Sequence, residues 1–236
     1  MITFLLLAVY FFLSMYFLYP QTLLPTLSYE KISNHFPSNS SSDFTVVIDP
    51  GHGGRDPGKV GTQETLEKEI NLKIGLYLKE LLERQNIKVI MTRDEDKDLA
   101  VTTGNFKTSD MKERISLIQK SNADLVISIH QNSYTSSEVY GAQCFYYSDS
   151  DEGKELAGFI QKQVITSTNQ TKIRDIKSNN DYYLLKHSPF PTVIVECGFL
   201  SNPKEETLLL IDAYQRKMAW AIHLGIFQYL NRETIH

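Results

Sequence analysis

The sequence is short of several features that would point to particular protein classes. It has only 2 cysteines, Cys144 and Cys197, which are too few for a disulfide framework and form either one bridge or two free thiols. It has no basic tract, and its 24 Lys and Arg residues are outnumbered by 28 Asp and Glu residues. Because nucleic-acid binding depends on neutralising phosphates, we expect no nucleic-acid partner.

The N-terminal part of the chain lacks charge, since no charged side chain precedes Glu30. Residues 2–19 are almost all apolar, and as a helix they would span about 27 Å, close to the thickness of a bilayer core. We therefore predict a membrane-targeting segment at residues 1–20. The segment has neither a basic start nor an Ala-x-Ala exit, so an uncleaved anchor is favoured over a cleaved signal, and both remain open.

Residues 21–43 contain two prolines and the polar run SNSSSD, a composition typical of a linker. We expect the folded domain to cover residues 44–236. If the anchor prediction holds, this domain lies outside the cytoplasm, either membrane-anchored or secreted.

The rest of the chain alternates between strand and helix patterns. Expected strands lie at 44–49, 88–92, 124–130, 141–147, 182–185 and 192–196. Expected helices lie at 64–84, from Met111 to Ile118, at 152–165, from Asn202-Pro203 onward and at 213–230, with loops at 94–110 and 169–181. This alternation predicts an α/β layer fold with a largely parallel sheet, in which ligands bind beyond the carboxyl ends of the strands.

Four side chains that can bind metal fall near that edge. His52 follows the first strand, while His130 and Glu196 each end another strand. Glu67 lies in the first turn of the helix expected at 64–84, on the same stripe as Ile70, and a carboxylate turned inward needs a cation or a hydrogen-bond partner. Two imidazoles and one carboxylate suit Zn²⁺ and leave a position for water. Each residue also has a plain alternative: a structural histidine, a surface glutamate or a strand cap.

Five segments, taken together, resemble one known family. They are DPGHGG (49–54), EKEINL (67–72), TRDED (92–96), SIHQN (128–132) and VECGFLSN (195–202). In this order they are similar to the zinc-dependent N-acetylmuramoyl-L-alanine amidases of the Amidase_3 type, over about residues 44–232. The resemblance implies a three-layer α/β fold with a mixed, mainly parallel six-stranded sheet and helices on both faces.

The resemblance also implies roles for matching positions. His52, Glu67 and His130 match the zinc ligands, and Glu196 matches the catalytic glutamate. The implied substrate is peptidoglycan, cut between the lactyl group of muramic acid and L-alanine. The organisation resembles spore-cortex members of the family, which implies a role in cortex maturation by muramic-δ-lactam formation. Some members carry an inserted helix that blocks the zinc site, but residues 147–182 have room for only one ordinary helix and a polar loop.

Two further residues are weaker candidates for substrate binding. Arg93 could contact a stem-peptide carboxylate or could be a structural ion-pair partner of nearby acids. Asn132 lies two residues beyond His130 and could orient the site or bind substrate. His223 is expected to be structural, and a nucleophilic role for Cys197 is not expected.

Two alternative functions use the same residues. One is a zinc peptidase that cuts within the stem peptide, and the other is a catalytically silent wall-binding module. Because no wall-binding repeat is visible, we expect localisation to come from the N-terminal segment or from a partner protein.

Overall fold

The computed structural model describes residues 44–102 and 104–232, and it contains one six-stranded sheet. The strands are β1 (Thr45–Pro50), β2 (Lys88–Met91), β3 (Leu125–Asn132), β4 (Gln143–Tyr146), β5 (Lys177–Ser178) and β6 (Thr192–Phe199). Their order across the sheet is β2-β1-β3-β6-β4-β5. Only the β4–β6 pair is antiparallel among these strands, so the expected mixed, mainly parallel sheet is confirmed.

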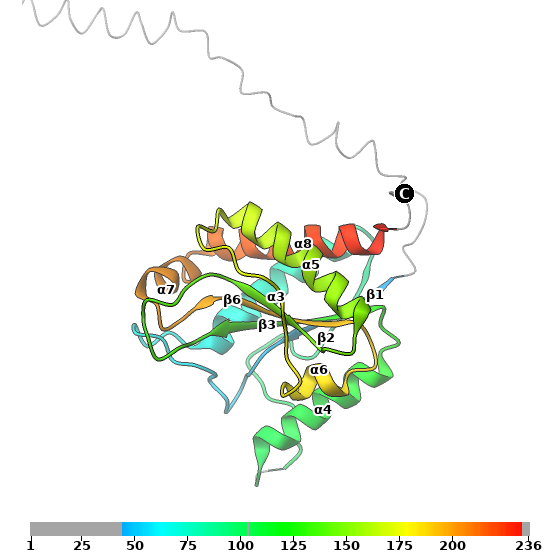
Figure 1. Ribbon diagram of the computed structural model, residues 1–236. Coiled ribbons are helices and arrows are strands. Elements are labelled where there is room, and N and C mark those ends of the chain that lie inside the picture. The colour runs from blue at the N-terminus through cyan, green and yellow to red at the C-terminus, as the bar shows by residue number, and fades with distance from the viewer. Residues whose placement is uncertain (1–43, 103, 233–236) are drawn as a thin grey trace, which may run out of the picture. The chain divides into compact units, whose positions relative to one another are not determined.

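Helices cover both faces of the sheet and complete the expected three layers (Figure 1). One face carries α3 (Glu67–Glu83), α5 (Asp151–Thr168) and α8 (Asp212–Leu230), and the other carries α4 (Phe106–Lys120) and α6 (Tyr183–His187). The larger core lies under α3, α5 and α8, where Ile127, Leu156 and Ile222 are 0% exposed. The short helix α7 (Pro203–Leu209) follows β6 directly.

Local sequence explains why these elements form. Every residue of β1 is buried, which suits a central strand covered on both faces. In α3 the residues Ile70, Ile74 and Leu78 are buried along one stripe, as the helical period requires. Asn202 caps α7 by accepting from the N–H groups of Lys204 and Glu205, and Pro203 follows it, as the sequence predicts.

The predicted strand at 182–185 is wrong, because α6 occupies this place. The sixth strand is β5, which lies inside the expected polar loop at 169–181. The Asn179 side-chain oxygen accepts from the N–H groups of Asp181 and Tyr182, and this Asx turn ends the extended chain just before α6. Two adjacent leucines, Leu184 and Leu185, are then buried from one helical turn rather than from a strand.

Two helix starts also differ from expectation. Helix α3 begins at Glu67 rather than at 64, because Glu64 has a left-handed backbone with φ 60°. Helix α4 begins at Phe106, within the expected loop at 94–110, because Asn105 caps it by accepting from the N–H of Thr108. The single helix between β4 and β5 is α5, which packs against α8 and β4.

The N-terminal hydrophobic segment at 1–20 and the linker at 21–43 lie outside the described residues, so both stay predictions. Within residues 44–102 and 104–232, none of the helices has the length and apolar character needed to cross a bilayer.

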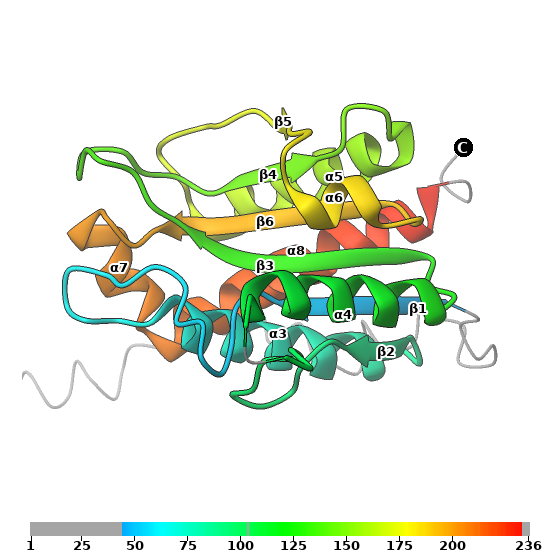
Figure 2. The ribbon, with the colours of Figure 1, turned by 90° about the horizontal axis from the view of Figure 1, so that it is seen from below.

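The topology gathers three of the four candidate residues at one edge of the sheet. His52 follows β1, and His130 and Glu196 lie near the carboxyl ends of β3 and β6. These strands are neighbours in the sheet, so their ends meet. Figure 2 shows the loop after β1 and the helix α7 together at this end of the sheet. These three candidate residues therefore lie together at the carboxyl ends of parallel strands, the position where ligands bind in such sheets.

On α8, the buried His223 offers a test of the fold. Its side chain is 2% exposed, and among the described residues neither ring nitrogen has a hydrogen-bond partner. Burial lowers the pKa of His223 to about 4, from an ordinary value near 6.5. Between these two values the unfolded chain binds a proton that the folded chain does not.

The free energy of unfolding should therefore fall as the pH drops from about 6.5 to 4, by up to about 1.4 kcal/mol per pH unit from this group. We expect His223→Leu to remove this contribution. Urea unfolding of both proteins at pH 7 and pH 5 measures it, and an equal pH dependence in the two would contradict it.

Candidate metal centre

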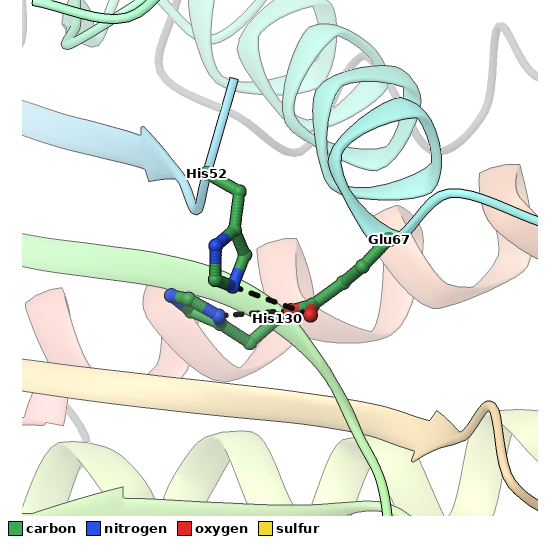
Figure 3. Close-up of side chains that lie close together, drawn as sticks. All are labelled: His52, Glu67 and His130. Atoms are coloured by element: carbon green, nitrogen blue, oxygen red, sulfur yellow. Dashed lines mark hydrogen bonds and ion pairs between the residues drawn. The ribbon is translucent and has the colours of Figure 1, made fainter. Parts of the chain in front are cut away.

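Three side chains from three elements converge at the edge of the sheet (Figure 3). His52 lies in the turn after β1, Glu67 is the first residue of α3, and His130 lies in β3. The Glu67 carboxylate contacts both imidazoles, with Oε2 3.2 Å from His52 Nε2 and Oε1 3.0 Å from His130 Nδ1. The two rings meet edge to face, with their centroids 5.0 Å apart.

This group has the size and chemistry of a metal site. One potential ligand atom from each residue lies within 4.8 Å of the others. The Glu67 side chain is 2% exposed, while those of His52 and His130 are 25% and 23% exposed. The carboxylate therefore forms the floor of the site, and the imidazoles border the solvent, from which a further ligand could enter.

The Glu67 carboxylate is also held by main-chain and amide donors. Its Oε2 accepts from the N–H of Lys59 at 2.8 Å, and its Oε1 accepts from the N–H of Gln131 at 3.0 Å and from Asn71 Nδ2 at 3.3 Å. Burial alone would raise the pKa of Glu67, but its contacts with the two imidazoles hold that pKa well below the usual range. Glu67 is therefore an ionised carboxylate with a fixed orientation.

His52 is oriented by a second carboxylate. Its Nδ1 lies 2.8 Å from Asp56 Oδ2, and Lys107 Nζ contacts the other oxygen of Asp56 at 2.8 Å. Burial opposes ionisation of Asp56, but the contacts with Lys107 and His52 lower its pKa. A carboxylate behind one ring nitrogen fixes the tautomer and turns the other nitrogen toward Glu67.

His130 is prepared for a cation in a different way. Burial alone would lower the pKa of its imidazole, but the Glu67 carboxylate raises it to about 8. In the metal-free protein His130 thus carries a proton over most of the neutral range and pairs with Glu67. A metal ion would displace that proton, which is a common property of histidine ligands.

Glu196 stands beside this group without belonging to it. In the β3–β6 pair it is directly opposite His130, so the two side chains share a face of the sheet. It is 7% exposed, and its Oε2 is buried without a hydrogen-bond partner among the described residues. Burial raises the pKa of Glu196 to about 7; His130 opposes this shift and Glu67 adds to it. A carboxyl group with this pKa can both take up and release a proton near neutral pH.

The sequence pattern of Amidase_3, described as N-acetylmuramoyl-L-alanine amidase, matches residues 46–228. The chain belongs to this amidase family.

Three relatives show how extensive the similarity is. The chain is 40% identical over 192 residues to the germination-specific N-acetylmuramoyl-L-alanine amidase of Bacillus subtilis, covering 80% of each protein. Its fold matches the CwlD amidase of Clostridioides difficile, solved in complex with the GerS lipoprotein, with a TM-score of 0.78 and 43% identity over 80% of this chain and 100% of that one. An N-acetylmuramoyl-L-alanine amidase of Nostoc punctiforme matches with a TM-score of 0.73 and 32% identity, over 82% of this chain and 100% of that one.

In this member of the family, two buried arginines support the turn that carries His52. Arg93, at 1% exposure, donates to the carbonyls of Pro50, Gly51, Lys68 and Glu95. Arg114, also at 1% exposure, donates to the carbonyl of His52 at 2.7 Å and to that of Pro50 at 3.1 Å. His52 itself has a left-handed backbone with φ 62°, which is unfavourable for a residue with a Cβ. The two guanidinium groups therefore hold a strained turn in place.

Asp49 balances the charge of these arginines. Its carboxylate pairs with Arg114 at 2.6 Å and accepts from the hydroxyl groups of Thr92 and Ser128. Burial would raise the pKa of Asp49, but Arg114 and the two hydroxyls lower it to about 2. Asp110 is the second anionic partner of Arg114, at 2.7 Å.

The remaining sequence candidates lie as follows. The hydrogen bonds of Arg93 go to main-chain carbonyls, and none of the ion pairs among the described residues joins it to the nearby acids expected as its partners. Substrate binding by Arg93 stays a prediction. Asn132 ends β3 next to Phe199, where its side chain accepts from the N–H of Ser133, and its substrate role also stays a prediction.

Cys144 and Cys197 are both free and buried, so the one-bridge alternative is wrong. Burial raises the pKa of Cys197 well above its usual range, which disfavours a thiolate.

Sequence reasoning missed several residues that orient the candidate ligands. Asp56 could have been found, because it lies four residues after a candidate histidine and is a carboxylate. Asn71 could also have been found, because it lies one helical turn after Glu67. Gly51 carries no such signal: its importance depends on the close approach of the His130 ring, which only the folded chain reveals.

A prediction follows from Gly51, where an added Cβ would overlap the His130 imidazole. The backbone of Gly51 does not need glycine, so the effect of Gly51→Ala is steric and is directed at the ring. We expect Gly51→Ala to lose divalent-metal binding and hydrolysis, measured by metal content and wall digestion.

Gly158→Ala, in α5 with no atom near the added Cβ, is the matched control. It should keep metal binding and either leave stability unchanged or raise it by up to about 1 kcal/mol. Metal affinity at the wild-type level in Gly51→Ala would contradict the prediction.

Proposed function

We propose that this chain is a zinc-dependent N-acetylmuramoyl-L-alanine amidase that cleaves peptidoglycan between the lactyl group of muramic acid and L-alanine. Family membership supports the amidase activity and the peptidoglycan substrate. The convergence of His52, Glu67 and His130 beside the buried Glu196 is the observation that carries the zinc-dependent mechanism.

The donor set fits zinc. Two imidazole nitrogens and one carboxylate oxygen are ligands that Zn²⁺ prefers, and three protein ligands leave one position open. His52, Glu67 and His130 would hold the ion. When bound, zinc would lower the pKa of a water molecule toward 7 and would polarise the scissile carbonyl.

Glu196 would carry the protons of the reaction. As a carboxylate, its unpartnered Oε2 takes a proton from the water that attacks the lactyl carbonyl. As a carboxylic acid, it then gives that proton to the nitrogen of L-alanine as the amide bond breaks. Its pKa of about 7 suits both steps. The products are a glycan strand with a free lactyl carboxylate and a stem peptide with a free amino group.

The biological setting is proposed from the relatives. One relative is named a germination-specific amidase and others are named probable cell wall amidases, which supports action outside the cytoplasm on cell wall peptidoglycan. We propose a role in spore-cortex maturation, where removal of the stem peptide prepares muramic acid for δ-lactam formation. We also propose that residues 1–20 attach the enzyme to the membrane.

A protein partner is part of the proposal. The CwlD amidase of Clostridioides difficile was solved in complex with the GerS lipoprotein. By analogy, a lipoprotein partner would localise this chain as well.

The first test of the mechanism is Glu196→Gln. The variant should keep one zinc per chain, because Glu196 is not a ligand, and should lose at least about 10²-fold in rate, because proton transfer is lost. Mass spectrometry of muropeptides measures the rate and also shows whether the bond cut is the lactyl–alanine amide or a bond within the stem peptide.

Glu152→Gln, an exposed acid in the first turn of α5, is the control and should keep the wild-type rate. A near-normal rate for Glu196→Gln would remove Glu196 from the mechanism. Products cut within the stem peptide would contradict the proposed amidase activity and would indicate a peptidase.

The second test is His130→Ala, which should lose both zinc and activity because two ligands seldom retain the ion. The exposed His187→Ala, on α6, should keep both. Metal analysis after dialysis decides the matter: stoichiometric zinc in His130→Ala would refute the ligand role.

A further inference from the structure

The carboxylate of Glu206 holds a loop that is distant in sequence but adjacent to the metal centre. Glu206 lies in α7 and is 0% exposed. Its Oε2 accepts from the N–H and the hydroxyl group of Thr62, and its Oε1 accepts from the N–H of Gln63 at 2.9 Å. Gly61 lies so close that an added Cβ would overlap the carboxylate. Figure 2 shows this loop and α7 side by side.

The loop held in this way is continuous with the Glu67 ligand. Residues 57–66 fold back on themselves, with Val60 bridged to Leu66 and the N–H of Gly61 donating to the carbonyl of Thr65. At the base of the loop, the Lys59 N–H donates to Glu67 Oε2, and the Glu67 N–H donates to the carbonyl of Lys59. The tip held by Glu206 and the base that holds Glu67 thus belong to one hydrogen-bonded unit.

The Glu206 carboxylate is stabilised by hydrogen-bond donors of the loop rather than by a counter-ion. None of the ion pairs among the described residues includes Glu206. Burial would raise the pKa of Glu206, but the hydroxyl and N–H donors of the loop lower it. The carboxylate is therefore ionised, and hydrogen bonds to an ionised acceptor are stronger than neutral ones. Opening the loop would leave this charge without its partners.

Glu205, the neighbouring residue of α7, holds different segments. Its carboxylate accepts from the N–H of Gly141 at 3.0 Å and from that of Phe199 at 2.8 Å. Glu205 shares helix α7 with Glu206, but among the described residues its hydrogen bonds go to Gly141 and Phe199 and not to the 57–66 loop that leads to Glu67.

We propose that Glu206 is a positioning residue that sets metal affinity by keeping the 57–66 loop closed against the Glu67 carboxylate. This inference rests on the proposed zinc site. It also connects the two halves of the centre, because α7 follows directly from the strand that carries Glu196.

The test compares Glu206→Ala, Glu206→Gln and Glu205→Ala with the wild-type full chain. Zinc affinity is measured by competition with a chromogenic chelator, and the opening of the loop is measured by amide hydrogen exchange at residues 61–63. We expect Glu206→Ala to weaken zinc binding by about 10- to 100-fold, the usual effect of losing a residue that orients a ligand. Exchange at Thr62 and Gln63 should become faster.

Glu206→Gln keeps one carbonyl oxygen and should show a partial loss, which also guards against a failure of Glu206→Ala to fold. Glu205→Ala should keep zinc affinity within about twofold of wild type while exchange at Gly141 and Phe199 becomes faster. General destabilisation would give a different result. It would lower the melting temperatures of Glu206→Ala and Glu205→Ala without making their zinc affinities differ.

Equal zinc affinity in wild type and Glu206→Ala, with faster exchange at 61–63, would overturn the inference and leave the zinc site intact. A wild-type chain that binds no zinc would instead overturn the proposed zinc site, and the inference with it. Equal losses of affinity in Glu205→Ala and Glu206→Ala would also overturn the inference, because the effect would then belong to α7 as a whole.

Discussion

The buried carboxylate of Glu67 is the constraint on which the rest of the site depends. At 2% exposure it would be costly as an isolated charge, and two imidazoles, two main-chain N–H groups and one amide offset that cost. These partners come from the turn after β1, the loop before α3, α3 itself and β3. The charge therefore ties the central strands to the helix that covers them, and it sets the position that a cation would occupy.

Around this charge, the fold uses buried polar groups to hold irregular backbone. Arg93 and Arg114 donate to the carbonyls of the turn that carries His52, and Asp49 balances them from within the sheet. Glu206 is an acceptor where the arginines are donors: its carboxylate accepts from the N–H groups of the loop that leads to Glu67. Cationic side chains thus bind main-chain carbonyls of the turn, and an anionic side chain binds main-chain N–H groups of the loop. Both give partners to main-chain groups that regular secondary structure leaves unpaired.

Much of the fold and the position of the candidate site could be predicted from the sequence, because strand and helix periods are local. They placed β1, β3 and β6 and the edge at which His52, His130 and Glu196 meet. The strand expected at 182–185 was wrong because an Asx turn at Asn179 decides that segment, and a short run of apolar residues does not distinguish strand from helix. The contacts of Gly51 and Glu206 could not be predicted, because they join residues far apart in the chain and leave no periodic signal.

The most direct test of the central claim is zinc K-edge X-ray absorption on the purified full chain. The account predicts one zinc per chain with only nitrogen and oxygen ligands at about 2.0–2.2 Å, including the multiple-scattering signal of two imidazoles. This signal should be reduced to one imidazole or lost in a chain that lacks either His52 or His130. Sulfur ligation near about 2.3 Å, or a zinc shell without imidazole, would contradict the account.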